Sequence, residues 1–236
     1  MKLRPLVSIY VVVLLVFLMI VQLGSRVVTV MIEKSPIENR NCIIIDAGHG
    51  GIDGGATSCS GVLESQINLQ ISLRLNDLLR FLGHDTIMIR TTDTSVYTEG
   101  NTIAAQKVSD LKNRVKTVNE TENALLVSIH QNTFSDGRYS GAQVFYAKDD
   151  ISKFFAEKMQ SAFIEALNPG SNRKCKSSDG IYLLQNIEAP GILIECGFLT
   201  NAEEDAKLND AAYQKKVSCV IASTVSEFLK NAPLSS

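Results

Sequence analysis

Short, mostly apolar runs alternate along this chain with longer stretches that have the periodicity of amphipathic helices. Strands that lack a polar face are buried on both sides, and helices between them provide the crossovers of a parallel sheet. We therefore predict an α/β fold of three layers, with a mostly parallel central sheet and helices on both faces. The expected strands are 42–46, 86–90, 124–130, 141–147, 181–184 (at an edge) and 191–195, and the expected helices are 64–82, 109–119, 151–167 and 210–229.

The N-terminal part of the chain is of a different kind. Residues 6–23 are apolar apart from Ser8 and Gln22, and Lys2 and Arg4 precede them. A membrane-spanning helix needs roughly 17–25 apolar residues, so this run is just long enough. We expect a retained signal-anchor, with a cleaved signal peptide as the alternative, and the basic residues in front favour export of the remainder. The predicted organisation is a signal-anchor or signal peptide at 1–25, a tether at 26–40 and one catalytic domain at 41–232.

Charge and cysteine content narrow the class of protein further. The formal net charge is −2, and no basic face stands out, so we expect no nucleic-acid partner. The five cysteines are scattered and odd in number, which does not suggest a disulfide framework. We expect most of them to be small buried hydrophobic residues. A single bridge between Cys59 and Cys175 stays open as an alternative.

Chemically capable side chains follow the predicted strands. His49 comes just after the first strand, His130 ends the third, and Glu195 ends the last. Because the carboxyl ends of parallel strands meet at one edge of a sheet, these residues are expected to be neighbours. Glu64 begins the first long helix, directly after the loop that carries His49, so it can reach the same edge. Two imidazoles and one carboxylate form a catalytic zinc set, and a further carboxylate can transfer the proton that hydrolysis needs.

Each of these residues also has a purely structural explanation. A histidine after a strand is often a hydrogen-bonded structural group. The third histidine, His84, follows Gly83 in a helix-to-strand turn, and we expect it to be a surface residue. Glu64 at a helix start can complement the helix dipole, which is worth roughly 0.3–1 kcal/mol. Glu195 can be one half of a buried ion pair. Spacing alone therefore leaves a zinc site and a structural role about equally open.

Four blocks of sequence occur in a characteristic order: IIIDAGHGGIDGGA, GVLESQINLQISLRL, LLVSIHQN and ILIECGFLTN. With them, residues 42–229 resemble the zinc-dependent N-acetylmuramoyl-L-alanine amidases, also called the amidase-3 family. The resemblance implies Zn²⁺ ligands at His49, Glu64 and His130 and a catalytic glutamate at Glu195. It also implies peptidoglycan as substrate, cleaved between the lactyl group of N-acetylmuramic acid and L-alanine of the stem peptide.

Within that family the chain is most similar to the germination-specific amidases of spore-forming bacteria. A membrane segment, a short tether and one catalytic domain fit them, as do LKNRVKTVNE, SGAQVFY and IYLLQ. The resemblance implies an exported enzyme, membrane-anchored or secreted, between the forespore and mother-cell membranes. Its role would be the formation of muramic lactam in the spore cortex. An accessory or activating protein is a conceivable partner. The segment 132–141 is too short for the inhibitory helix that cell-division relatives insert.

The sequence departs from the family pattern at two positions and offers three further residues near the predicted site. Alanine at position 47 and glutamine at position 131 differ from the common family residues, but neither is a ligand. Asp46 is expected to orient His49, and Asn132 and Arg90 are candidate substrate contacts. Two rival functions remain: a zinc peptidase acting within the stem peptide, and a protein that binds peptidoglycan without cleaving it.

Overall fold

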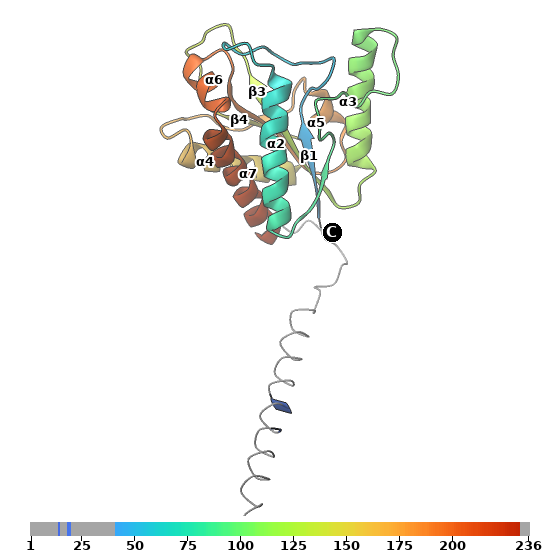
Figure 1. Ribbon diagram of the computed structural model, residues 1–236, viewed down its shortest axis with the longest axis vertical. Helices are drawn as coiled ribbons and strands as arrows, with labels where there is room; N and C mark the ends of the chain where they lie inside the picture. Colours follow the sequence, from blue (N-terminus) through green and yellow to red (C-terminus); the bar gives the residue numbers. More distant parts are fainter. Residues whose placement is uncertain (1–13, 15–17, 20–40, 232–236) are drawn as a thin grey trace, which may run out of the picture. The chain divides into compact units, whose positions relative to one another are not determined.

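The computed structural model describes residues 14, 18–19 and 41–231 (Figure 1). The predicted signal-anchor and tether at 1–25 and 26–40 lie outside these residues, apart from the three isolated positions. Among the described residues, no helix combines the length and the apolar character that crossing a bilayer requires. The chain divides into one unit at 1–39 and a second at 40–236, and the second is the one described below.

A central sheet of six strands organises the described part of the domain (Figure 1). Its strand order is β2-β1-β3-β6-β4-β5. The neighbours β2, β1, β3 and β6 run parallel, whereas β4 is antiparallel to β6 and carries β5 at the edge. The mostly parallel sheet predicted from the sequence is thereby confirmed. The strands are β1 (Cys42–Ala47), β2 (Asp85–Met88), β3 (Ala124–Asn132), β4 (Gln143–Tyr146), β5 (Lys176–Ser177) and β6 (Gly191–Phe198).

Helices cover both faces of this sheet, as the alternation of apolar runs and helical stretches predicts. Along β1, Ile43 and Ile45 belong to the core under α2, α4 and α7, whereas Ile44 belongs to the core on the other face, where α3 and α5 pack. This alternation follows from the period of two along a strand. The helices are α2 (Glu64–Phe81), α3 (Ile103–Asn119), α4 (Asp150–Ala166), α5 (Tyr182–Asn186), α6 (Ala202–Leu208) and α7 (Ala211–Asn231).

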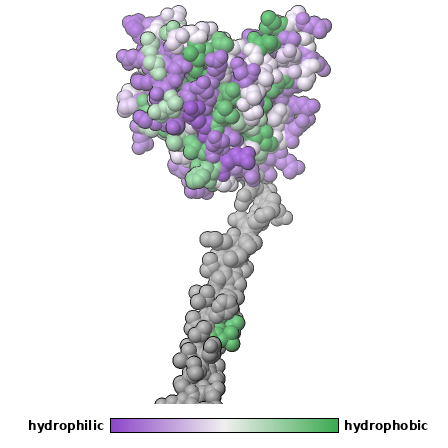
Figure 2. Space-filling view, viewed as in Figure 1, coloured by the Kyte–Doolittle hydropathy of each residue, from purple (hydrophilic) through white to green (hydrophobic). Residues whose placement is uncertain are grey.

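The surface of the domain mixes polar and apolar residues. On the face seen in Figure 2, green apolar residues are scattered among purple hydrophilic ones and do not merge into one large patch. Isolated exposed apolar side chains of this kind are normal for a globular domain. Within residues 41–231, the most exposed large apolar side chain is that of Phe81, the last residue of α2.

Two predicted elements differ from the structure. The run at 181–184, expected as an edge strand, lies mainly in the short helix α5, and the edge strand is β5. Apolar runs of four residues do not distinguish a strand from a buried helical turn, and here Leu183 and Leu184 bury against the sheet from a helix. The helix predicted at 109–119 begins earlier, at Ile103, where Thr102 caps it by accepting a hydrogen bond from the backbone N–H of Ala105.

The cysteine prediction is also wrong. Cys196 alone among the five is buried, while Cys59 and Cys219 are exposed and the other two are half-buried. All five are free thiols, so Cys59 and Cys175 form no bridge.

Candidate metal centre

The three side chains predicted to bind a metal lie together at the carboxyl edge of the sheet. His49, Glu64 and His130 each offer a ligand atom, and these atoms lie within 4.8 Å of one another. Nε2 of His49 is 3.3 Å from Oε2 of Glu64, and Nδ1 of His130 is 3.1 Å from Oε1 of the same carboxylate. The two imidazole rings meet edge to face with centroids 4.9 Å apart. Residues that are far apart in sequence thus converge as the strand order predicts.

Glycines allow this convergence. A Cβ atom at Gly48 would lie 2.2 Å from Nε2 of His130, and one at Gly55 would lie 2.6 Å from Oε2 of Glu64. Both distances are far shorter than van der Waals contact, so a larger residue at either position would push the ligand side chains apart. His49 itself has φ 60°, a left-handed conformation that costs a non-glycine residue about 1–3 kcal/mol. Its surroundings must therefore hold it in place.

Two buried arginines hold the backbone of this loop. The carbonyl of Ala47 accepts from Nε of Arg90 at 2.7 Å and from Nη1 of Arg114 at 3.0 Å. Nη2 of Arg90 donates to the carbonyl of Gly48 at 3.0 Å, and Nη2 of Arg114 donates to that of His49 at 2.7 Å. The left-handed turn is thus fixed by charge-assisted hydrogen bonds, which are the strong ones.

The same contacts correct two predictions. Arg90 is 3% exposed and its donors are occupied by backbone carbonyls, so it is not available as a substrate contact. Asp46 does not orient His49: it is 1% exposed, pairs with Arg114 and accepts from Oγ of Ser128 at 2.6 Å. Burial raises the pKa of Asp46, but Arg114, His130 and the hydrogen bonds to Ser128 and Arg114 together hold it below its usual range. Both residues therefore stabilise the loop that carries His49, Arg90 directly and Asp46 through Arg114.

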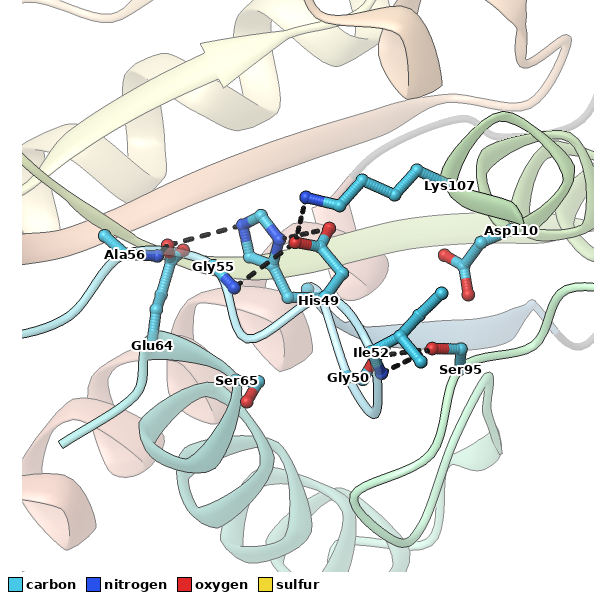
Figure 3. Close-up of polar contacts among 12 residues, drawn as sticks. His49, Gly50, Ile52, Gly55, Ala56, Glu64, Ser65, Ser95, Lys107 and Asp110 are labelled. Carbon is cyan, nitrogen blue, oxygen red and sulfur yellow. Dashed lines mark hydrogen bonds and ion pairs between the residues drawn. The ribbon is translucent and has the colours of Figure 1, made fainter. Parts of the chain in front are cut away.

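Asp53 is the carboxylate that orients His49. Its Oδ2 lies 2.8 Å from Nδ1 of the ring, and its Oδ1 pairs with Nζ of Lys107 at 2.7 Å. Figure 3 shows the ring of His49 between Glu64 and the amino group of Lys107. With Nδ1 engaged in this way, Nε2 is the nitrogen that faces Glu64. The sequence argument missed this residue, although a carboxylate four positions after a candidate ligand in the same glycine-rich loop is a usable signal. Such outer partners fix ring orientation and tautomer.

The charges of the group suit a cation. Burial raises the pKa of Glu64, but hydrogen bonds and attraction from His130 and His49 lower it well below its usual range. Glu64 is therefore a carboxylate, and its Oε2 also accepts from the backbone N–H of Ala56 at 3.0 Å. Burial lowers the pKa of His49, but Glu64 and Asp53 outweigh burial and raise it to about 9. The carboxylates of Glu64 and Asp53 thus favour positive charge at this point, which is the condition that a cation site requires.

Glu195 lies beside this group on β6, in register with His130 on β3. Its Oε2 is buried and has no hydrogen-bond partner among the described residues. Burial raises its pKa, and after the opposing effect of His130 and the repulsion from Glu64 the value is about 7. A carboxyl group that titrates near neutral pH can both accept and return a proton. Asn132 ends the same strand β3 and is half-buried, so its predicted contact with substrate stays a prediction.

The donor set fits zinc. Two imidazole nitrogens and one carboxylate are the ligands of one class of hydrolytic zinc sites, which leave a position free for water. The buried, unpaired oxygen of Glu195 adds the acid–base group that such sites need beside the ligands. Nothing in the geometry of these four residues requires a different cation.

The fold and the side chains at its carboxyl edge are those of an α/β amide hydrolase. The N-acetylmuramoyl-L-alanine amidase family profile matches residues 43–227, and the chain belongs to this family. It is similar to the germination-specific N-acetylmuramoyl-L-alanine amidase of Bacillus subtilis (strain 168), with 37% identity over 185 residues that cover 76% of either chain.

Solved structures of amidases have the same fold as this chain. The CwlD amidase from Clostridioides difficile, determined in complex with the GerS lipoprotein, superposes with a TM-score of 0.78 at 38% identity, covering 82% of this chain and 100% of that one. An N-acetylmuramoyl-L-alanine amidase from Clostridium difficile 630 superposes with a TM-score of 0.70 at 30% identity, covering 82% and 99%.

Proposed function

We propose that this chain is a zinc-dependent amidase of spore cortex peptidoglycan. It cleaves the amide bond between the lactyl group of N-acetylmuramic acid and L-alanine of the stem peptide. The observation that carries the zinc assignment is the convergence of His49, Glu64 and His130, with Glu195 beside them, at one edge of the sheet. The similarity to a germination-specific amidase supports the cortex as the site of action.

The residues have distinct roles in this reaction. His49, Glu64 and His130 would hold Zn²⁺, which would supply a Lewis acid for the amide carbonyl and lower the pKa of a water molecule. Glu195 accepts the proton of the attacking water as the new C–O bond forms. It then returns a proton to the nitrogen of L-alanine as the C–N bond breaks, so that a lactyl carboxylate and a free peptide amine leave. Proton transfer of this kind is typically worth about 10²–10⁴ in rate.

Asp53 and the glycines support these roles. Asp53 keeps the Nδ1 side of His49 occupied, so that Nε2 is presented to the metal. The close approach at Gly48 leaves the ring of His130 room to face the same point. Burial raises the pKa of Glu195 to about 7, and a group that titrates near neutral pH can transfer a proton in both directions.

The cellular setting is part of the same proposal. Residues 1–25 anchor the chain or direct its export, residues 26–40 tether it, and residues 41–232 form the catalytic domain. The enzyme acts between the forespore and mother-cell membranes. The solved complex of a similar amidase with a lipoprotein supports an accessory protein as a partner here.

A zinc peptidase within the stem peptide would use the same chemistry on a different bond, and a binding protein would use none of it. Mass spectrometry of digested muropeptides separates the three cases. An amidase releases intact stem peptides and leaves unsubstituted muramic acid, a peptidase leaves shortened peptides on the glycan, and a binding protein leaves both unchanged.

The Glu195→Gln variant is the sharpest test of the mechanism. We expect it to retain zinc and to lose amidase activity by about 10²-fold or more, because an amide cannot carry the proton. The matched control is Glu203→Gln, which changes an exposed glutamate at the start of α6 and should keep full activity. Full activity in Glu195→Gln would remove this residue from the mechanism. Full zinc content in His49→Ala would remove His49 from the ligand set.

A further inference from the structure

Helix α2 ends in a conspicuously exposed aromatic residue. Phe81 is 87% exposed, more than any other large apolar side chain in residues 41–231, and the adjacent Leu82 is 52% exposed. Single exposed leucines need no explanation. A phenylalanine that is almost wholly in water has a larger free-energy cost, because the cost grows with the apolar area exposed. Its exposure points to a surface that is covered in the working protein.

The position of Phe81 follows from the phase of the helix. The buried apolar side chains of α2 recur at Ile67, Ile71, Leu75 and Leu79, which define one stripe against the sheet. Phe81 comes two residues after the last of them, about 200° around the helix, and therefore points away from the core. No interior contact of the domain accounts for its aromatic ring.

This end of α2 lies at the amino edge of the sheet, opposite the candidate metal centre. The register pairs Cys42 with both Asp85 and Ala124, so β1, β2 and β3 all start here. His130 lies near the other end of β3, which has nine residues and is roughly 25 Å long at 3.3 Å per residue. In Figure 1, α2 runs along the sheet from one of these edges to the other.

The chain also enters the domain at this amino edge. Asn41 is the residue before β1, and the predicted anchor and tether precede it in the sequence. From the end of the apolar run at residue 23 to Asn41 there are about 18 residues, which span at most roughly 60 Å when fully extended. A membrane that holds the apolar run would therefore lie within this distance of Asn41.

The surroundings of Phe81 mix apolar and basic groups. A hollow of about 440 Å³ at the same edge of the domain is lined by Arg80, His84 and Ile87, among others, although Phe81 and Leu82 do not line it. Arg80 is exposed and forms no ion pair among residues 41–231, and Ile87 is 40% exposed. The exposed carboxylate of Asp85 lies at the same edge, so the attraction is chiefly apolar. Burial and Lys230 lower the pKa of His84, so Arg80 is the one cationic group of this set. An exposed aromatic and an exposed aliphatic side chain next to an arginine are residue types that favour a lipid interface.

We propose that the Phe81–Leu82 end of α2 inserts into the interfacial region of the lipid bilayer that anchors the chain. The proposal rests on the proposed anchoring of residues 1–25. A short tether makes the contact effectively intramolecular and raises the effective concentration of the lipid surface. Even a weak apolar contact is then formed most of the time. The contact holds the amino edge of the sheet against the lipid, and the candidate metal centre, at the opposite edge, faces the peptidoglycan.

The chain has no tryptophan, which makes the test direct. The Phe81→Trp variant of the full chain carries a single indole at the proposed contact and is reconstituted into phosphatidylcholine–phosphatidylglycerol vesicles with brominated acyl chains. Because interfacial side chains lie roughly 5–10 Å into the headgroup and acyl boundary, we expect a blue-shifted emission and a loss of about half its intensity. The matched control is Phe134→Trp, at a residue 50% exposed on the loop after β3. Its ring packs against Tyr139 and not against lipid, so its emission should remain unquenched by the brominated chains.

Each other outcome overturns the proposal. Water-like and unquenched emission from Phe81→Trp means that Phe81 does not reach the lipid. An indole at position 81 that is shielded from iodide but not quenched by bromine means that a second copy or another protein covers this end of α2. Failure of the full chain to float with vesicles removes the anchor and the proposal with it. Amidase activity on isolated peptidoglycan is measured in the same variants, so a failure of the proposed function is seen separately.

Discussion

At the scale of single residues, the candidate metal centre depends on glycines next to the ligands as much as on the ligands themselves. Gly48 lies against the ring of His130, where a Cβ atom would come within 2.2 Å of Nε2 and 2.3 Å of Cε1. The neighbouring atoms belong to a ring fixed by its contact with Glu64, so they have little freedom to move away. The position of His130 is therefore sensitive to one methyl group.

We predict that Gly48→Ala displaces His130 and removes most of the zinc and the amidase activity. The cost in folding free energy should be about 1–3 kcal/mol, the usual range for overpacking, so the variant stays folded. Zinc content by atomic absorption and thermal unfolding are measured together. The control is Gly54→Ala in the same loop, where the added Cβ meets only the flexible methyl groups of Leu63 at 3.1 Å. Normal zinc content in Gly48→Ala would contradict the prediction.

The sequence predicts which residues converge here but not how each side chain is directed. Strand ends and family blocks single out His49, Glu64 and His130, and the structure brings their ligand atoms together. The same reasoning placed Arg90 at the edge as a substrate contact, yet its guanidinium turns inward to backbone carbonyls. Asp53 was missed because its contact with His49 depends on a left-handed loop that no periodicity reveals.

At the scale of elements, strand β1 and helix α3 are joined by buried charge. Asp46 near the end of β1 pairs with Arg114 of α3, which also binds Asp110 one turn earlier through Nε at 2.6 Å. Arg114 is 3% exposed at its side chain, so the pair is almost wholly removed from water. Removing one partner from such a pair typically costs about 3–5 kcal/mol, because a buried charge is left uncompensated.

We predict that Asp46→Asn destabilises the domain by about 3–5 kcal/mol at neutral pH. The folded pKa of Asp46 is lowered, so its contribution is present above the unfolded value near 3.8 and is lost as the pH falls through the folded value. The difference between wild type and variant should therefore shrink below about pH 4, where Asp46 of the unfolded wild type becomes protonated, and vanish once Asp46 of the folded protein is protonated too. Urea unfolding at several pH values measures it.

The control for this prediction is on the same helix. Glu120→Gln removes an exposed pair with Lys116, in which the two side chains are 67% and 66% exposed. Its effect should stay below about 1 kcal/mol at every pH. A constant difference between wild type and Asp46→Asn across the acid range would show that the charge of Asp46 contributes nothing to stability.

Elements with a clear period were predicted well, and those without one were not. The helix at 64–82 matches α2 closely because Ile67, Ile71 and Leu75 repeat at helical spacing over several turns. The run at 181–184 offers only two buried leucines, which fit a strand or a single helical turn equally well. The start of α3 was missed because its first two turns expose Ile103 and Val108 instead of burying an apolar stripe.

At the scale of the whole molecule, the hydrophobic core does not depend on the candidate metal centre. One core lies between the sheet and α2, α4 and α7, and another lies on the opposite face under α3 and α5. The four side chains of the centre sit beyond these clusters, at one edge. A domain whose core is complete without a metal differs from small zinc modules, which unfold when the metal is removed.

We therefore predict that chelation of zinc leaves the domain folded but less stable. Zinc at about 100 times its dissociation constant stabilises by about 2.7 kcal/mol. For a domain of this size, that corresponds to a rise in Tm of about 5–10 °C. Calorimetry before and after a chelator should show this loss, and added zinc should restore it. The His130→Ala variant should show no shift on chelation, because its ligand set is incomplete. Complete unfolding on chelation would mean that the metal, and not the two cores, determines the stability of the fold.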